Sequence, residues 1–296
     1  MYELIQISEH DYYIESPVRV GIIRINDSEV VMIDSGSDKD AGKKALKHIT
    51  EHGWNLRAVY NTHSHADHIG GNKLLQDRAG CKVYAYGVEC AFVNNPILEP
   101  SLLYGGMPPE ELARDKRYRA QESDAEQLTE EKLPPGFTML QLPGHSPSMV
   151  GFLTPDGNAF LGDAVLSAET LEKYPVSYNM DIGTHLQTLE ALKSVEAHTY
   201  VPAHAPAIRT REELLTLIQK NIDVICEVSE QIRELCKEPC CMDILLKRIF
   251  AHYHMNMVLP QYCLVATTVR SQLLWLRKNG RAEMFVEDNE IRWKAV

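Results

Sequence analysis

Short apolar stretches separated by turn residues fill the first 33 positions of the chain. Each stretch is rich in Ile, Val and Tyr, and the breaks carry Ser-Pro and Asn-Asp-Ser, a pattern typical of strands joined by turns. The stretches are residues 3–7, 12–15, 18–25 and 29–33. We therefore predict an antiparallel meander, and its last strand delivers Asp34 into a Ser-Gly turn.

The pattern then changes between helical and strand periods. The predicted elements are a helix at 38–52, a strand at 57–61, a helix at 72–79 and a strand at 82–86. Ser37 or Asp38 is the expected cap of the first helix, and Gly53 ends it. This alternation of strand and helix predicts a layered α/β architecture. His48 and His52 lie four positions apart on a Lys-rich segment, and we expect both to be ordinary surface residues.

Residues 88–135 lose this periodicity and collect Pro, Gly and acidic residues. A structureless stretch of this length in a compact domain is usually a functional lid or a disordered segment. Its position between two parts of the chain that carry candidate ligands favours a lid-like insertion. We therefore name Tyr104, Gly105 and Gly106, within this segment, as candidates for contact with a substrate.

Strands return after the insertion, and the chain ends in helices. The predicted elements are strands at 138–142, 158–163 and 198–204, helices at 184–196, 242–253 and 262–279, and a hairpin within 280–296. From Thr210 apolar residues recur every three or four positions over a long stretch, which predicts a further helix. We expect a catalytic domain over residues 1–208 and a small, mainly helical domain over 209–296.

Charge and composition exclude several classes of protein. The net charge of −11 argues against a general polyanion binder, although residues 205–296 are about neutral with 13 basic against 12 acidic side chains. The sequence holds no run of 18 apolar residues, so no transmembrane helix is expected. The first residues lack the layout of a signal peptide, and seven irregularly spaced cysteines favour reduced thiols. We therefore expect a cytoplasmic protein.

Three histidines and an aspartate crowd into six positions directly after the strand at 57–61. They are His63, His65, Asp67 and His68, and a Gly-Gly turn follows them. Imidazole is the commonest protein ligand for zinc, and a carboxylate adds a hard, negatively charged oxygen. The alternative is a polar surface loop that happens to be His-rich. The density of the pattern, and matching residues downstream, favour a metal site.

The pattern His63-Ser-His-Ala-Asp-His68 resembles the hallmark of the metallo-beta-lactamase-fold hydrolases. That family has a four-layer αββα fold, and the resemblance implies further ligands at three strand ends: His145 in Pro-Gly-His, Asp163 in Gly-Asp, and His204 in Pro-Ala-His. By the same resemblance, His63, His65 and His145 hold a first ion and Asp67, His68 and His204 a second, with Asp163 bridging. Asp34 is then expected beside the cluster, supporting a ligand. Tyr178, between Asp163 and His204, is a further candidate for substrate contact.

The sequence differs from two related groups of enzymes at ligand positions or next to them, and these differences narrow the expected activity. The glyoxalase II-like branch usually continues from Pro-Gly-His with Thr-x-Gly-His, whereas this chain continues Ser146-Pro-Ser-Met149. The true beta-lactamases carry a cysteine where this chain has Asp163, which disfavours antibiotic hydrolysis. The C-terminal helices and hairpin resemble the winged-helix module of the branch that includes beta-lactamase-like protein 2, a ribonuclease.

The resemblance implies a hydrolase with two divalent metal ions, of which zinc is the first expectation and iron or manganese the alternatives. A bridging hydroxide would attack the substrate, and Asp67 would help to pass a proton to the leaving group. A small thioester or ester, as in hydroxyacylglutathione hydrolase, is the leading substrate class. The alternatives are a lactone or an RNA phosphodiester, and the acidic charge balance weighs against RNA. A non-catalytic binding protein would be expected to lose ligands, and this chain keeps all of them.

Overall fold

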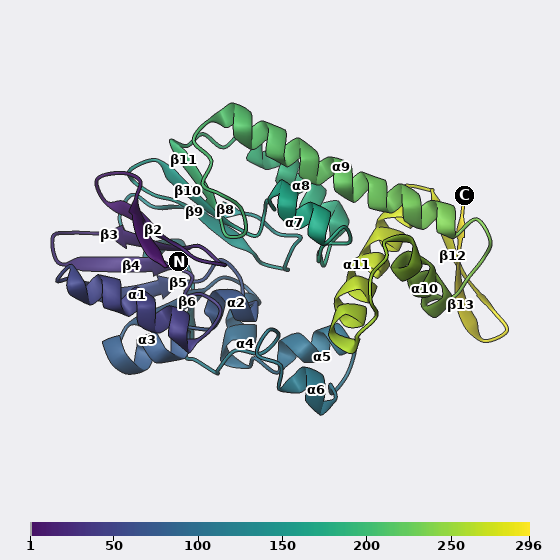
Figure 1. Ribbon diagram of the computed structural model, residues 1–296, viewed down its shortest axis with the longest axis horizontal. Coiled ribbons are helices and arrows are strands. Elements are labelled where there is room, and N and C mark those ends of the chain that lie inside the picture. Colours follow the sequence, from purple (N-terminus) through teal and green to yellow (C-terminus); the bar gives the residue numbers. More distant parts are fainter. Residues whose placement is uncertain (1) are drawn as a thin grey trace.

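The computed structural model describes residues 2–296, and two β-sheets lie face to face on the left of Figure 1. The larger sheet has the order β1-β2-β3-β4-β5-β6-β7. Its strands are Glu3–Gln6, Asp11–Glu15, Val20–Arg24, Glu29–Ile33, Asn55–Tyr60, Lys82–Ala85 and Ala125–Gln127. Strands β1 to β4 are antiparallel, so the predicted meander is confirmed, and β4 to β7 pair in parallel.

The smaller sheet has the order β11-β10-β9-β8. Its strands are β8 (Thr138–Gln141), β9 (Val150–Leu153), β10 (Asn158–Gly162) and β11 (Thr199–Pro202). Strands β8, β9 and β10 are antiparallel, whereas β10 and β11 are parallel. The facing sides of the two sheets share one apolar core that contains Val31, Tyr60, Phe152 and Phe160. This core fixes the distance between the strand ends that carry the candidate ligands.

Replacing Phe152 by a smaller residue should measure how much the core between the sheets contributes to the stability of the fold. The side chain is fully buried in the core between the sheets, where Tyr60 lies against it in an edge-on arrangement. Replacing a buried Phe by Ala removes apolar contact and leaves a cavity, which typically costs about 3–5 kcal/mol. We expect Phe152→Ala to lower the free energy of unfolding by that amount in denaturant titration. A loss below about 1 kcal/mol would contradict this role, because such a value is typical of surface substitutions.

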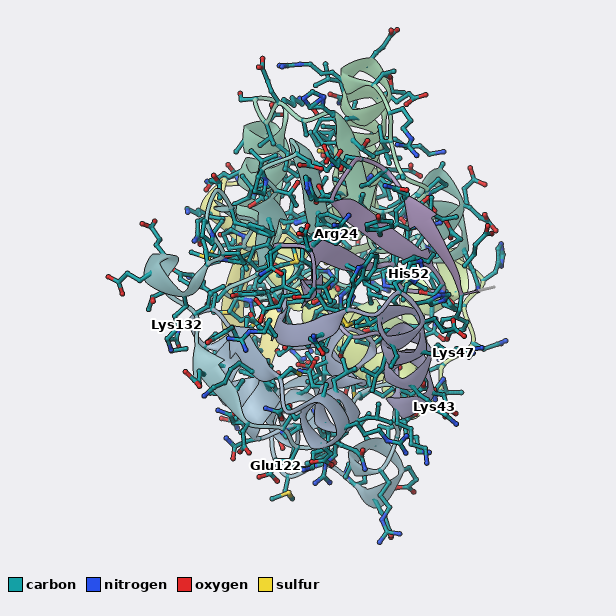
Figure 2. All side chains as sticks on the ribbon, turned by 90° about the vertical axis from the view of Figure 1, so that its left-hand side faces the viewer. Arg24, Lys43, Lys47, His52, Glu122 and Lys132 are labelled. Carbon is teal, nitrogen blue, oxygen red and sulfur yellow. The ribbon has the colours of Figure 1, made fainter. Side chains whose placement is uncertain are left out.

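Helices cover the outer faces of both sheets. Helices α1 (Lys39–Glu51) and α3 (Asn72–Ala79) pack against the larger sheet, and the Asp38 side chain caps α1 as predicted. Lys43 and Lys47 of α1 are exposed, and so is His52, which follows the helix and stacks on Trp54 (Figure 2). Helix α8 (Ile182–Leu192) and the first half of α9 (Arg211–Leu235) cover the smaller sheet. The four layers are therefore helix, sheet, sheet and helix.

The segment 88–135 is folded, which corrects the interpretation as a structureless stretch. It forms α4 (Glu89–Asn94), α5 (Leu98–Tyr104), α6 (Glu110–Ala113), strand β7 and a 3-10 turn at Glu130–Lys132. Strand β7 extends the larger sheet at its edge. The helices are short and have no repeating apolar face, and for this reason periodicity did not reveal them. The function of the segment as a lid stays a prediction.

The C-terminal region consists of three helices and a hairpin. After α9 come α10 (Met242–His252), α11 (Leu259–Lys278), β12 (Ala282–Glu287) and β13 (Glu290–Ala295). Asp288 and Asn289 make the hairpin turn with positive φ angles, which Asn and Asp adopt more readily than most residues. These helices and the hairpin are the predicted ones, and the winged-helix resemblance stays a prediction.

Helix α9 connects the two halves of the molecule. Its first half joins the core under the smaller sheet through Leu214 and Ile218, and its second half joins the C-terminal core through Val228 and Ile232. Helix α11 contacts α8 and α5 as well as α9. The division at residue 208 stays a prediction: α9 begins just after it, at Arg211, and belongs to both cores. Within residues 2–296, no helix combines the length and the apolar composition that crossing a bilayer requires.

Candidate metal centre

The candidate ligands lie on loops and turns that follow strands. Thr62 and His63 follow β5, and α2 (Ala66–Ile69) begins shortly afterwards and carries Asp67 and His68. His145 follows β8, while Asp163 and His204 follow the parallel strands β10 and β11. The carboxyl ends of parallel strands meet at one edge of a sheet, so each sheet presents its ligands at the same end.

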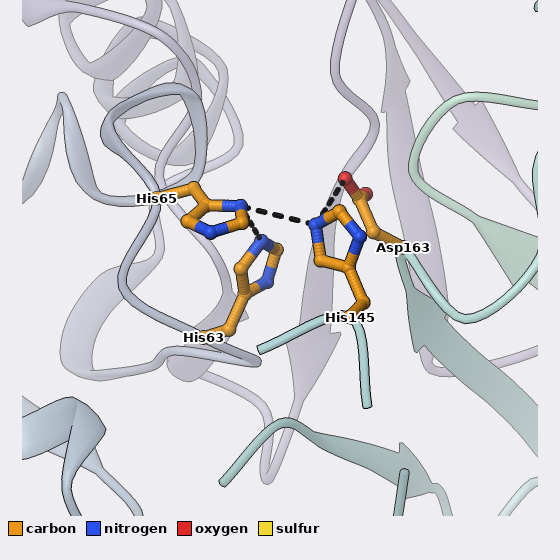
Figure 3. Close-up of side chains that lie close together, drawn as sticks. All are labelled: His63, His65, His145 and Asp163. Atoms are coloured by element: carbon orange, nitrogen blue, oxygen red, sulfur yellow. Dashed lines mark hydrogen bonds and ion pairs between the residues drawn. The ribbon is translucent and has the colours of Figure 1, made fainter. Parts of the chain in front are cut away.

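Four of the seven predicted ligands form one group: His63, His65, His145 and Asp163 (Figure 3). One ligand atom from each lies within 4.8 Å of the others. His65 Nδ1 is 3.0 Å from both His63 Nε2 and His145 Nε2, and His145 Nε2 is 3.4 Å from Asp163 Oδ2. These side chains come from both sheets, and they converge from opposite sides.

The other three predicted ligands, Asp67, His68 and His204, form a second group with the same 4.8 Å spread. His204 Nε2 is 3.2 Å from Asp67 Oδ2. Asp163 also reaches this group, because its Oδ1 is 3.2 Å from His68 Nε2 and its Oδ2 is 3.5 Å from His204 Nε2. The structure thus brings all seven residues together, with the Asp163 carboxylate between the two groups.

Hydrogen bonds on the far side of each ring fix which nitrogen faces the cluster. His68 Nδ1 donates to Asp34 Oδ2 at 2.8 Å, since a carboxylate only accepts. Thr62 Oγ1 also donates to Asp34 Oδ2, so it must accept its 3.0 Å bond from His63 Nδ1. His145 Nδ1 donates to the Tyr178 carbonyl oxygen at 3.1 Å. The Nε2 lone pairs of all three histidines therefore point into the cluster, as metal ligation requires. Asp34 lies beside the cluster and supports the ligand His68, as predicted.

Two buried atoms of the cluster, His68 Nε2 and Asp163 Oδ1, lie 3.2 Å apart, and neither forms a hydrogen bond of good geometry within residues 2–296. A buried polar atom without a partner is costly, and such groups in native proteins commonly serve a ligand. His65 Nδ1 can carry one proton at most, so it cannot donate to both nitrogens that approach it. Nitrogen and carboxylate donors in this arrangement suit a divalent cation such as zinc, iron or manganese. The residues therefore fit a metal.

In the first group, the pKa shifts favour the forms that bind metal. Burial, with the neighbouring His68 charge, lowers the pKa of His63 well below its usual value, and burial lowers that of His145 to about 4. Burial alone would raise the pKa of Asp163, but the charges of His204 and His68 hold it well below its usual value. Near neutral pH the first group thus offers neutral imidazoles and an ionised carboxylate. In the second group, Asp163 raises the pKa of His204, and against the effect of burial Asp163 and Asp34 raise that of His68, so a cation that binds there would displace protons from these rings.

Three further residues at the cluster escaped prediction: Thr62, Glu89 and Glu99. Glu99 on α5 is 8% exposed, and its Oε1 is 3.5 Å from His65 Nε2. Burial and the charges of Glu89 and Asp67 raise the pKa of the Glu99 carboxyl to about 8. Both glutamates belong to the aperiodic segment with many acidic residues, so no sequence signal separated them from solvated neighbours.

The candidates for substrate contact occupy two different surroundings. The Tyr178 ring centre is 5.3 Å from that of His65 and 5.5 Å from that of His145, so this side chain borders the cluster. Tyr104 is 49% exposed at the end of α5, where Gly105 forms a left-handed cap. The residue of α5 that contacts the cluster is Glu99. Substrate contact by any of these residues stays a prediction.

Comparison with known proteins identifies the family. Residues 14–204 match the model of the metallo-beta-lactamase superfamily. The chain belongs to the metallo-beta-lactamase superfamily. The predicted family and the predicted class of enzyme, a hydrolase, are thereby confirmed. The superfamily match ends at His204 and so includes every candidate ligand.

Relatives from this superfamily are similar over part of the chain. A hydroxyacylglutathione hydrolase from Vibrio cholerae is 26% identical over 213 residues, which are 69% of this chain and 71% of that protein. Hydroxyacylglutathione hydrolase GloC from Haemophilus influenzae is 26% identical over 141 residues, which are 47% of this chain. The match covers 63% of the length of that relative.

Solved structures show the same fold over nearly the whole chain. A beta-lactamase domain protein from Burkholderia ambifaria aligns with a TM-score of 0.70 at 17% identity, covering 99% of this chain and 94% of that one. A metallo-beta-lactamase family protein from Thermus thermophilus aligns with a TM-score of 0.69 at 18% identity, covering 99% and 97%. The predicted α/β fold is confirmed, and the shared fold includes the C-terminal helices α9 to α11.

Proposed function

We propose that this protein is a hydrolase of small thioesters or esters that uses two divalent metal ions. The observation that carries the proposal is the arrangement of seven ligands in two groups, with Asp163 between them. His63, His65 and His145 would hold the first ion, and Asp67, His68 and His204 the second. Divalent cations in such a site supply a bound water of lowered pKa and a Lewis acid for the substrate carbonyl.

One ligand, Asp67, would also move a proton during the reaction. The Asp67 side chain is 36% exposed, against 7% for Asp163, so it faces the accessible side of the cluster. Burial opposes the charge of Asp67, but His68 and His204 hold the pKa of its carboxyl at about 2. An ionised, accessible carboxylate at this position can accept a proton from the attacking water and pass it to the leaving thiol or alcohol.

The thioester class rests on the similarity to hydroxyacylglutathione hydrolases, since the ligand cluster alone does not choose among esters, thioesters, lactones and phosphodiesters. The RNA alternative would use the C-terminal module as a binding platform. Buried side chains recur along most of α11, where the helix packs on α8, α9 and α5. This burial and the net charge of −11 favour a packing role for the module and a small-molecule substrate.

Thiol release from a panel of acyl-thioesters by the zinc-loaded protein tests the proposal. We expect turnover with at least one small thioester, and we expect Asp67→Ala to abolish it by removing both a ligand and the proton carrier. Thiol release is followed with a chromogenic thiol reagent, and bound metal is counted in both proteins. Equal turnover by the wild type and Asp67→Ala would show that the cluster does not catalyse the reaction. Activity only on lactones or single-stranded RNA would replace the proposed substrate class.

A further inference from the structure

Glu89 is a buried carboxylate on the 88–135 segment, at the first position of α4. It is 1% exposed, and within residues 2–296 neither Glu89 nor Glu99 forms an ion pair with a lysine or an arginine. Burying an ionised carboxylate is costly unless hydrogen bonds or a nearby cation compensate it. The contacts of Glu89 show which groups do so.

The Glu89 carboxylate accepts four hydrogen bonds from two separate loops. Its Oε2 accepts from the Ser64 amide at 3.1 Å and from Ser64 Oγ at 2.5 Å. Its Oε1 accepts from Ser146 Oγ at 2.7 Å and from the Ser148 amide at 2.9 Å. A carboxylate has acceptor sites for all four donors, and no other protein side chain of this size accepts on both terminal atoms.

The two loops are those of the first metal site. Ser64 stands between His63 and His65, and Ser146 directly follows His145, where the sequence departs from the glyoxalase II-like pattern. We propose that Glu89 is a positioning residue of the first metal site: it fixes the spacing of the loops that carry His63, His65 and His145. The inference rests on the metal site of the proposed function.

The same segment supplies Glu99, whose Oε1 lies 3.5 Å from the outward nitrogen of His65. Asp34 supports the site differently, because it bonds to His68 directly and to His63 through Thr62. The 88–135 segment thus contributes two carboxylates around the first metal site, and Asp34, directly after β4, contributes a third carboxylate that reaches both His68 and His63. A cation bound nearby lowers the cost of burying the Glu89 carboxylate, so metal binding and the folding of this segment stabilise each other.

Glu89→Gln tests the inference, because glutamine keeps the shape of the side chain but turns an amide NH2 toward two of the four donors. In metal-free protein, we expect faster hydrogen exchange at the amides of Ser64 and Ser148. Titration with Co²⁺, followed by its visible absorption and by competition with a chelator, should show affinity at the first site lowered about 10- to 100-fold. Melting temperature is recorded for each variant.

Leu112→Ala is the matched control, because Leu112 is fully buried in the same segment and packs with Leu103 and Cys263 of α11, but its apolar side chain forms no hydrogen bond to either loop. We expect it to lower the melting temperature and to keep first-site affinity. The inference would be overturned if Glu89→Gln bound Co²⁺ at the first site as tightly as the wild type, or if both variants lost the same amount of affinity there. If Glu89→Gln does not fold, Ser146→Ala removes one of the four bonds, and an unchanged affinity there overturns it.

These outcomes are distinguishable from failure of the proposed function. A wild-type protein that binds no Co²⁺ would overturn the proposed metal site, and the positioning role with it. Wild-type binding combined with an unaffected Glu89→Gln variant would overturn only the role of Glu89. Neither result depends on knowing the substrate.

Discussion

Replacing Asp163 by alanine is expected to abolish hydrolysis and to lower bound metal below two ions per chain. The carboxylate contacts three histidines: His68 at 3.2 Å, His145 at 3.4 Å and His204 at 3.5 Å. Without it the two groups of ligands lose their common member, and His145 loses the carboxylate that faces its Nε2. Loss of metal-assisted stabilisation is worth several kcal/mol, or a factor of about 10³ or more in rate.

Metal analysis by mass spectrometry and the thioester assay measure the two effects together. Asp156→Ala is the matched control, because Asp156 is a carboxylate on the neighbouring turn that bonds to Ser8 and His10, away from the cluster. The control should keep two ions and full activity. Full metal content and full activity in Asp163→Ala would remove the bridging role from this residue.

Replacing Asp34 by asparagine should have the next largest effect, although the two side chains have the same shape. Asp34 has φ +61°, a left-handed conformation that asparagine also adopts readily, so the backbone should accept the change. The asparagine NH2 would face His68 Nδ1, and the proton of the ring would move to Nε2. A protonated Nε2 cannot bind metal. We expect affinity at the second site to fall about 10- to 100-fold, with activity falling in parallel.

Nitrogen-15 NMR of the histidine rings distinguishes this cause from simple unfolding, because it reports which nitrogen carries the proton. In metal-free protein at a pH above the raised pKa of His68, the wild type should show this ring protonated on Nδ1 alone, and Asp34→Asn should show the other tautomer. Asp34→Ala is the comparison variant, since alanine leaves Nδ1 without any partner and imposes no tautomer. An Asp34→Asn variant with the wild-type tautomer and weakened metal binding would contradict the proposed mechanism.

The ligands could be predicted from the sequence because they follow recognisable strands. His63 to His68 follow an apolar strand, and Asp163 and His204 each close another. The dense motif after a strand located His63, His65, Asp67 and His68. The family resemblance supplied His145, Asp163 and His204 at three further strand ends, and it supplied the division into two groups.

The residues that hold the ligands in position could not be predicted from the sequence. Glu89 and Glu99 lie on helices of six and seven residues, too short to show a repeating apolar face. Strand β9 and the short helix α7 (Ala168–Lys173) also escaped prediction. Long-range contacts decide which acidic residues of this segment are buried. An example is the hydrogen bond that Glu89 accepts from Ser146. Such contacts follow only from the assembled sheets.

The packing of α11 on α5 and α8 has a consequence for damage to the chain. Leu103 and Leu112 from the 88–135 segment bury their side chains with Cys263 near the start of α11. A protease that cut the chain after α10 would uncover this apolar surface, and exposed patches of this kind promote aggregation. The clipped enzyme would therefore precipitate or be cleared, and it would not persist as a smaller active form.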